Sequence, residues 1–103
     1  MKYTKITTMD KLEEGKIHSF ETKYMNLGIL WIGKEILAFE DVCTHDGERI
    51  SSGKLENCTI TCPRHMARFD LRTGEALCMP ATEDLQKLNV RIQDGNVEVE
   101  LED

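Results

Sequence analysis

Two short pairs of cysteine and histidine constrain this chain more than any other feature of its sequence. Cys43 and His45 are separated by one residue, Cys62 and His65 by two, and sixteen residues lie between the pairs. In each pair a thiolate and an imidazole stand within reach of each other, where an expected strand gives way to a loop. Two neighbouring loops can bring four such ligands together, so we expect a fold that sets these loops side by side around a metal.

The four cysteines (Cys43, Cys58, Cys62 and Cys78) favour a metal site over a disulfide framework. Residues 1–5 lack the apolar segment of a signal peptide, so we expect a cytoplasmic protein. Disulfides are rare in that reducing compartment, where clustered cysteines more often bind metal or carry out redox chemistry.

The donor set indicates which metals to consider. Thiolates suit soft metals and iron–sulfur clusters, and neutral imidazoles suit zinc, copper and iron. Two cysteines and two histidines fill four metal positions, which disfavours catalysis at the metal and favours a structural or electron-transfer role. Zinc is the rival, because Cys2His2 is a common tetrahedral zinc set. Zinc fingers usually pair cysteine with cysteine, whereas mixed pairs suit a two-iron cluster, so a zinc-stabilised interaction domain is the alternative left open.

Length and charge narrow the function further. At 103 residues the chain fits a single domain over 1–103. Nineteen acidic against thirteen basic residues give a net charge of −6 with no basic stripe, which argues against nucleic-acid binding. The apolar run 29–32 is four residues long, far short of the ~18 that cross a bilayer, so we expect no membrane association.

The apolar pattern predicts many short strands and little helix. Strands are expected over residues 3–6, 16–22, 27–32, 35–39, 58–62, 68–71, 76–78, 88–92 and 97–101. A helical turn over 9–14 is expected to begin after the capping residue Thr8 and to end at Gly15. Strands at this spacing indicate an all-β antiparallel sandwich or small barrel.

Two segments carry further expectations. In the last predicted hairpin, Leu88, Val90 and Ile92 are expected to point to the same face of a single strand. Residues 41–57 are polar and are expected to form a loop, and a loop of that length in a compact domain usually has a function.

With these residues in view, the chain resembles the Rieske [2Fe–2S] proteins. Their two-part motif, C-x-H followed by C-x-x-H, corresponds to residues 43–45 and 62–65. The similarity extends to Gly53, to residues 67–70 with Gly74, to Pro80-Ala81 and to the last hairpin, and it covers about residues 3–101. Within the family, the chain is most similar to the small soluble Rieske-type ferredoxins that supply electrons to oxygenases.

The resemblance implies a Rieske-type fold of three small antiparallel sheets, with one [2Fe–2S] cluster held at the tip by two loops. It implies that Cys43 and Cys62 hold the inner iron, and that His45 and His65 hold the outer, more exposed iron. It also implies a monomeric electron carrier that takes one electron from a flavin-dependent reductase to a terminal oxygenase or similar enzyme. A Rieske oxygenase itself needs a second iron site, for which only His18 is left, so we expect no enzyme. The alternative is a small subunit docked permanently on a larger reductase, as in some nitrite reductases.

One departure from the family pattern concerns the thiols. Glu48 and Arg64 stand where Rieske proteins of cytochrome complexes carry a disulfide. That bridge cannot form here, so we expect Cys58 and Cys78 to be free thiols with a structural role.

Two further departures concern the surroundings of the cluster. Ala67 and Phe69 replace the Ser and Tyr hydroxyls of high-potential relatives, which predicts a low reduction potential. Met66 stands where the family usually has glycine, so either the loop takes a different path or an apolar group lies beside the exposed iron. We expect Met66, with Pro80 and Ala81, to form an apolar rim that contacts a partner.

Overall fold

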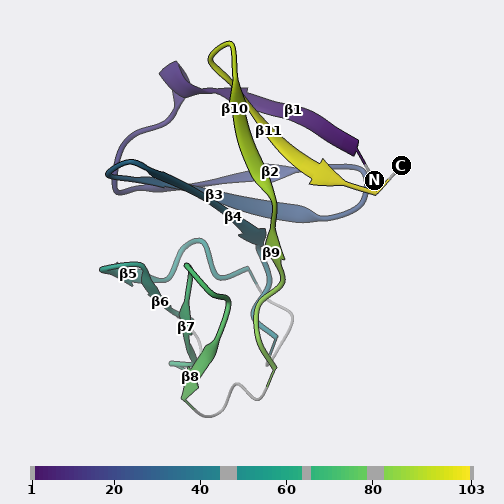
Figure 1. Ribbon diagram of the computed structural model, residues 1–103. Coiled ribbons are helices and arrows are strands. Elements are labelled where there is room, and N and C mark those ends of the chain that lie inside the picture. The colour runs from purple at the N-terminus through teal and green to yellow at the C-terminus, as the bar shows by residue number, and fades with distance from the viewer. Residues whose placement is uncertain (1, 45–48, 64–65, 79–82, 103) are drawn as a thin grey trace.

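The computed structural model describes residues 2–44, 49–63, 66–78 and 83–102 (Figure 1). Apart from one 3-10 turn, η1, its regular elements are strands, which confirms the all-β prediction. The elements are β1 (Lys2–Thr8), η1 (Met9–Lys11), β2 (Ile17–Glu21), β3 (Asn26–Ile32), β4 (Glu35–Glu40), β5 (Lys54–Glu56), β6 (Thr59–Thr61), β7 (Arg68–Asp70), β8 (Ala76–Cys78), β9 (Lys87–Leu88), β10 (Val90–Gln93) and β11 (Asn96–Leu101).

Two sheets form the part of the molecule that we call the base, the upper part in Figure 1. One has the strand order β1-β11-β10 and the other β2-β3-β4-β9, and neighbouring strands are antiparallel. The alternating residues Val97, Val99 and Leu101 of β11 are buried, as the period-two pattern predicts. They share a core with Leu27 and Ile29 of β3, so this core joins the two sheets.

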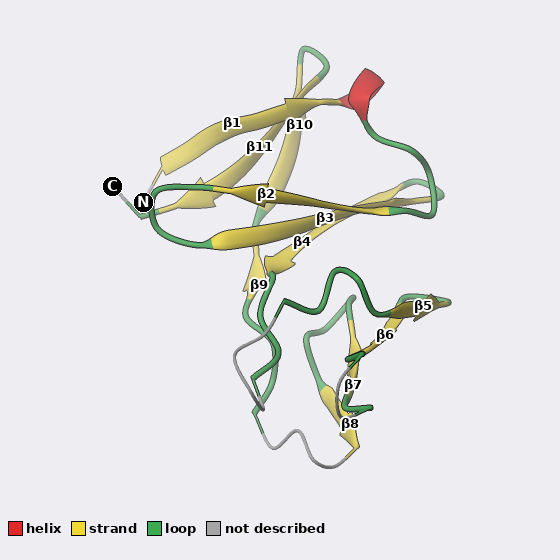
Figure 2. Ribbon diagram, turned by 180° about the vertical axis from the view of Figure 1, so that it is seen from behind, coloured by secondary structure: helices red, strands yellow, loops and turns green. Residues whose placement is uncertain are grey.

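The third sheet has the order β5-β6-β7-β8 and, with the loops that join it to β4 and β9, forms the part that we call the tip. Each of its strands has three residues. Figure 2 shows the tip below the base and both chain ends together at one side of the base. The three antiparallel sheets agree with the fold that the resemblance implies.

The sheet β2-β3-β4-β9 is a central layer with a core on each face. Ala38 of β4 packs in the core of the base, whereas its neighbours Leu37 and Phe39 pack in a second core shared with the tip. Successive side chains of a strand point to opposite faces, so a central strand must be apolar throughout. This explains why β4 has an apolar run where a half-exposed strand would alternate.

The prediction of one strand over 88–92 is wrong. Leu88 of β9 pairs with Ala38 in the central sheet, but Val90 of β10 pairs with Val99 in the other sheet. The chain thus changes sheets at Asn89. As a result Leu88 is buried while Ile92 is 44% exposed, instead of both facing one core.

Three smaller predictions also need correction. The expected loop 41–57 contains β5, whose three residues pair with β6. The helical turn ends at Lys11 instead of Glu14, and Thr8 makes no side-chain cap to its backbone. Cys58 lies in the turn before β6 and not in the strand.

Within the described residues, the structure contains no helix with the length and apolar character of a membrane span.

Candidate metal centre

Cys43 and Cys62 lie in loops that leave neighbouring parts of the fold. Cys43 follows β4, Cys62 follows β6, and neither side chain is exposed. Both belong to the core shared by base and tip, together with Ala67 and Phe69. The fold therefore gathers two thiols from segments nineteen residues apart in the sequence. The other two predicted ligands, His45 and His65, lie outside the described residues.

The second loop turns back tightly after Cys62. The Cys62 amide donates to the Ala67 carbonyl at 2.7 Å, and the Met66 amide donates to the Cys62 carbonyl at 3.1 Å. Met66 has a φ of 61°, in the left-handed region that glycine adopts easily, and its side chain is 66% exposed. The two alternatives for Met66 were a different loop path and an exposed apolar group. The loop keeps the backbone conformation that glycine would adopt, and the apolar side chain of Met66 points to solvent.

The first loop is closed by a buried carboxylate that the sequence analysis missed. Asp41 is only 2% exposed, and its Oδ1 accepts from the amides of Ile50 at 3.0 Å and Ser51 at 2.9 Å. Its Oδ2 accepts from the Ser19 hydroxyl of β2 at 2.7 Å. An acidic residue directly after an apolar strand, two positions before a candidate ligand, is the sequence signal that could have identified it.

Gly53 lets the end of the first loop approach the second. A Cβ at this position would stand 2.0 Å from the Thr61 carbonyl oxygen, so only glycine fits. The Gly53 amide donates to the Ile50 carbonyl at 2.8 Å. Thr61 is the residue before Cys62, and the contact therefore holds the two predicted ligand loops together.

A third segment, residues 83–85, closes the tip. The Thr44 hydroxyl donates to the Glu83 carbonyl at 2.6 Å, next to Cys43. The Leu85 amide donates to the Gly74 carbonyl at 2.7 Å, and a Cβ on Gly74 would meet the Leu85 oxygen at 2.5 Å. Pro80 and Ala81, the other two residues of the predicted apolar rim, lie outside the described residues.

Cys58 and Cys78 are free thiols, as predicted. Cys58 is buried in a two-residue turn with Asn57, and both have positive φ. Its carbonyl accepts from the Leu71 amide at 2.8 Å, so the turn is tied to the end of β7. Cys78 is partly buried, with its Sγ 3.8 Å from the Met66 carbonyl oxygen. Both cysteines thus contact other segments of the tip, which is consistent with the predicted structural role.

An ion pair at the surface connects the tip with the base. Arg72, after β7, meets Glu35 at the start of β4, with 3.1 Å between Nη2 and Oε1. Arg72 Nε also donates to the Glu35 carboxylate, and this hydrogen bonding raises the pKa of the Arg72 guanidinium. This pair links the tip to the base, and it adds little to stability because both side chains are about half exposed.

The described donors fit an iron–sulfur cluster. Two buried thiols in an apolar core are suited to ligate a soft metal as thiolates, and Ala67 and Phe69 keep water away from them. No group of three or more potential ligands occurs within residues 2–44, 49–63, 66–78 and 83–102. Two of the four predicted ligands lie outside these ranges, so the described part can supply only half of the predicted set.

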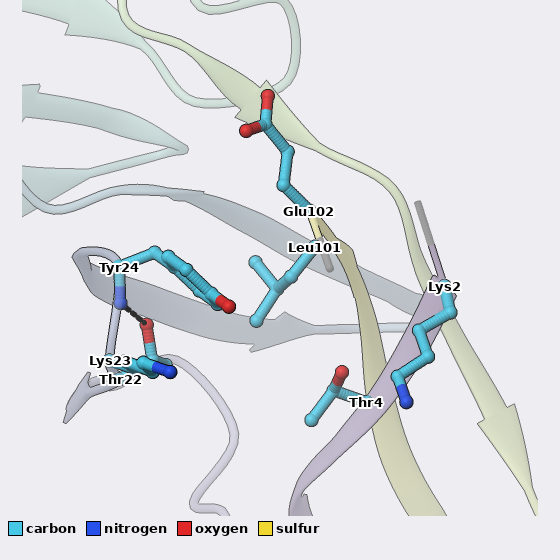
Figure 3. A pocket seen from close by; sticks show the side chains of 7 residues that line it. All are labelled: Lys2, Thr4, Thr22, Lys23, Tyr24, Leu101 and Glu102. Carbon is cyan, nitrogen blue, oxygen red and sulfur yellow. Dashed lines mark hydrogen bonds between the residues drawn. The ribbon is translucent and has the colours of Figure 1, made fainter.

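The pocket in Figure 3 lies elsewhere, between the chain ends and the turn after β2. It has a volume of about 290 Å³ and is lined by Lys2, Thr4, Thr22, Lys23, Tyr24, Leu101 and Glu102. All of these residues belong to the base. The pocket is therefore separate from the candidate metal centre.

Comparisons with known proteins identify the family. The chain is 35% identical over 94 residues to a ferredoxin component of naphthalene 1,2-dioxygenase/salicylate 5-hydroxylase systems from Ralstonia sp, covering 91% of this chain and 90% of that one. It is 39% identical over 93 residues to the 3-phenylpropionate/cinnamic acid dioxygenase ferredoxin subunit of Photorhabdus laumondii subsp. laumondii, covering 89% and 88%.

A solved structure is similar over nearly the whole chain. A chain in the complex of reduced oxygenase and oxidized ferredoxin in carbazole 1,9a-dioxygenase has a TM-score of 0.87 and 28% identity, covering 97% of each chain. The Rieske [2Fe-2S] domain family matches residues 2–89, which include both predicted ligand loops. The chain therefore belongs to the Rieske [2Fe-2S] domain family.

Proposed function

We propose that this chain is a Rieske-type ferredoxin that carries one electron from a flavin-dependent reductase to a terminal oxygenase or similar enzyme. The observation that carries the proposal is the match, along about nine-tenths of the chain, to two proteins named as ferredoxins of dioxygenase systems. Ferredoxins are carriers, so the chain acts as a component of an oxygenase system without bond chemistry of its own. The names of these two relatives also favour a ferredoxin over a small subunit docked permanently on a larger reductase.

Four residues hold the cofactor in this proposal. Cys43 and Cys62 bind the inner iron as thiolates, and His45 and His65 bind the outer iron. Membership of the Rieske family implies one [2Fe–2S] cluster. This favours the cluster over the alternative of a zinc-stabilised domain. When bound, such a cluster accepts and releases one electron at a time. Histidine ligands raise its potential above that of an all-cysteine cluster.

The apolar side chains around the thiols exclude water from the inner iron. Ala67, Phe69 and Leu85 are almost fully buried beside Cys43 and Cys62. The resemblance to Rieske proteins implies that His45 and His65 hold the more exposed iron, which would give electrons a short path to a partner. This asymmetry suits a carrier that must protect its cofactor and still exchange electrons at one side.

Met66 marks the proposed docking face. Its exposed side chain borders a groove of about 510 Å³ beside Cys62. The groove is lined by Ser52, Gly53, Lys54, Glu56, Thr61, Cys62, Pro63, Met66 and Arg68. An exposed apolar side chain ringed by polar groups is typical of a transient interface. We propose that the oxygenase contacts this face.

The chain is further proposed to be a single-domain monomer of the cytoplasm. Its radius of gyration is 13.0 Å, the value of about 13 Å expected for one compact domain of 100 residues. The edge strand β1 carries Lys2 and Lys5, which discourage pairing with another sheet. The free thiols Cys58 and Cys78 suit a reducing compartment.

The cofactor is tested by analysing the purified protein. We expect two irons and two sulfides per chain, a red-brown colour, and in the reduced state the low-g electron-resonance signal of mixed Cys/His ligation. One zinc per chain with no visible absorption would contradict the ferredoxin proposal.

The docking face is tested by Met66→Glu, with Ile92→Glu as the matched control. Both replace an exposed apolar residue, at 66% and 44% exposure, but Ile92 lies on β10 of the base. We expect Met66→Glu to slow electron delivery to the oxygenase with an unchanged visible spectrum, and Ile92→Glu to leave delivery unchanged. Equal rates for the two variants would place the docking face elsewhere.

A further inference from the structure

Asp41 carries a buried carboxylate that is neither a predicted ligand nor part of the proposed docking face. It accepts three hydrogen bonds: two from the backbone amides of Ile50 and Ser51, and one from the Ser19 hydroxyl. Its own amide donates to the Asn26 carbonyl of β3 at 2.9 Å. A carboxylate at 2% exposure is costly to bury unless such donors surround it. The site is therefore built for this side chain.

The three bonds close the loop that carries Cys43. Asp41 stands at the start of the loop, and Ile50 and Ser51 stand at its end, so the carboxylate clasps one end to the other. The bond from Ser19 fastens this clasp to β2 in the base. Ile50 is fully buried, and without the carboxylate its amide would lose its acceptor. Asp41 thus holds together the two ends of the loop that carries Cys43.

The clasp also holds a carboxylate two residues before the predicted ligand Cys43. The donors from Ser19, Ile50 and Ser51 are all neutral groups, so these bonds hold the negative charge without cancelling it. Asp41 is two residues from Cys43, and its Cα therefore lies within about 7 Å of that of the ligand. A buried charge at this range is only weakly screened by solvent.

We propose that Asp41 is a positioning residue of the metal centre: it fixes the loop carrying Cys43, and its charge holds the reduction potential down. The inference rests on the proposed function, because it needs a cluster that gains an electron. Reduction adds negative charge, which a neighbouring carboxylate opposes. Asp41 therefore contributes to the low potential that Ala67 and Phe69 predict.

Three substitutions separate the clasp from the charge. In Asp41→Asn, the amide oxygen can still accept from Ile50 and Ser51, and the amide nitrogen can donate to the Ser19 oxygen. This variant keeps the clasp and removes the charge. Asp41→Ala removes both, and Ser19→Ala keeps the charge and the two amide bonds while it removes the link to β2.

We expect Asp41→Asn to retain the iron and sulfide content of the unaltered protein, with a midpoint potential raised beyond the measurement error. Asp41→Ala should lose iron faster and should exchange the Ile50 and Ser51 amide protons about tenfold faster, the effect of one lost buried hydrogen bond. Ser19→Ala should keep the potential close to that of the unaltered protein.

Each part of the inference can be overturned separately. An unmoved potential in Asp41→Asn with an intact cluster would remove the charge effect. Unchanged iron loss and amide exchange in Asp41→Ala would remove the clasp. If Asp41→Ala does not fold, the clasp is tested by the exchange rates of the Ile50 and Ser51 amides in Asp41→Asn. The clasp requires these rates to equal those of the unaltered protein, and faster exchange would contradict it. Colour, iron and sulfide in the unaltered protein test the proposed function itself, independently of these variants.

Discussion

The turn glycines of the base and two glycines of the tip serve different purposes, although Gly28 of β3 in the base also allows a close approach, to the Phe39 ring. At Gly15, Gly33 and Gly95 of the base, φ is positive and a Cβ would meet nothing within 4 Å. These glycines serve only the conformation of a turn. In the tip, a Cβ on Gly53 or Gly74 would strike a backbone oxygen at 2.0 or 2.5 Å. There glycine serves the close approach of separate segments.

The same contrast holds for the strands. In the base, β1 and β3 have seven residues each and β11 has six, with apolar side chains on shared cores. In the tip, every strand has three residues, and specific backbone contacts join the segments. Apolar burial nevertheless stabilises both regions, because Ile60 and Phe69 of the short strands are fully buried in the core that the tip shares with the base. The tip differs in its additional close backbone contacts and in its predicted metal ligands.

The largest expected effect is that of losing a ligand. His45→Ala, or removal of iron with a chelator, should abolish the visible absorption and the amide protection of the tip strands, while β1 and β11 stay protected. The reason is that the core of the base does not include the ligand loops. Hydrogen exchange checks this, with His18→Ala as the matched control, since His18 lies on β2. Loss of protection in both regions together would show that base and tip unfold as one unit.

Glycine substitutions test the contrast in packing. Gly53→Ala should lower the free energy of unfolding by about 3 kcal/mol and lower the iron content, because the new Cβ meets the Thr61 backbone at 2.0 Å. Gly15→Ala, with open space around it, should cost about 1 kcal/mol for its positive φ alone and leave the iron content unchanged. Denaturant unfolding and iron analysis measure both. Equal losses would mean that close approach adds nothing at Gly53.

The reduction potential tests the chemistry of the tip alone. Ala67 and Phe69 are fully buried and have no side-chain donor, so the midpoint should lie near −150 mV, at the low end of the roughly −150 to +300 mV range of Rieske centres. The double change Ala67→Ser and Phe69→Tyr should raise it, with each hydroxyl contributing. Protein-film voltammetry measures the shift. A midpoint above about +100 mV in the unaltered protein would refute this explanation.

The smallest expected effect concerns backbone strain. Met66→Gly should stabilise the tip by about 1 kcal/mol, because Met66 has a φ of 61°. Asp94→Gly in the base, at a φ of 54°, should gain less, because aspartate tolerates this conformation better than methionine. Thermal unfolding of both variants checks the order. A larger gain at Asp94 would contradict it.

Much of the base could be predicted from the sequence because its pattern is local. The alternation of Val97, Val99 and Leu101 indicated a strand with one buried face, and the turn at Gly33 separated β3 from β4. The sheet change at Asn89 could not be predicted in this way, since Leu88, Val90 and Ile92 keep the same alternation. Whether they share a face depends on the partners β4 and β11, which the local pattern does not name.

In the tip, the sequence by itself determined the chemistry and the tertiary structure determined its support. The spacing of Cys43, His45, Cys62 and His65 restricted the metal before any fold was known, because few cofactors take that donor set. The clasp of Asp41 joins residues nine to ten positions apart in an irregular loop. The approach of Gly53 to Thr61 joins residues eight positions apart, at the open end of the β5–β6 hairpin. No repeating pattern marks such contacts, because hydrogen bonds and close backbone packing are set by position in space and not by the period of a strand.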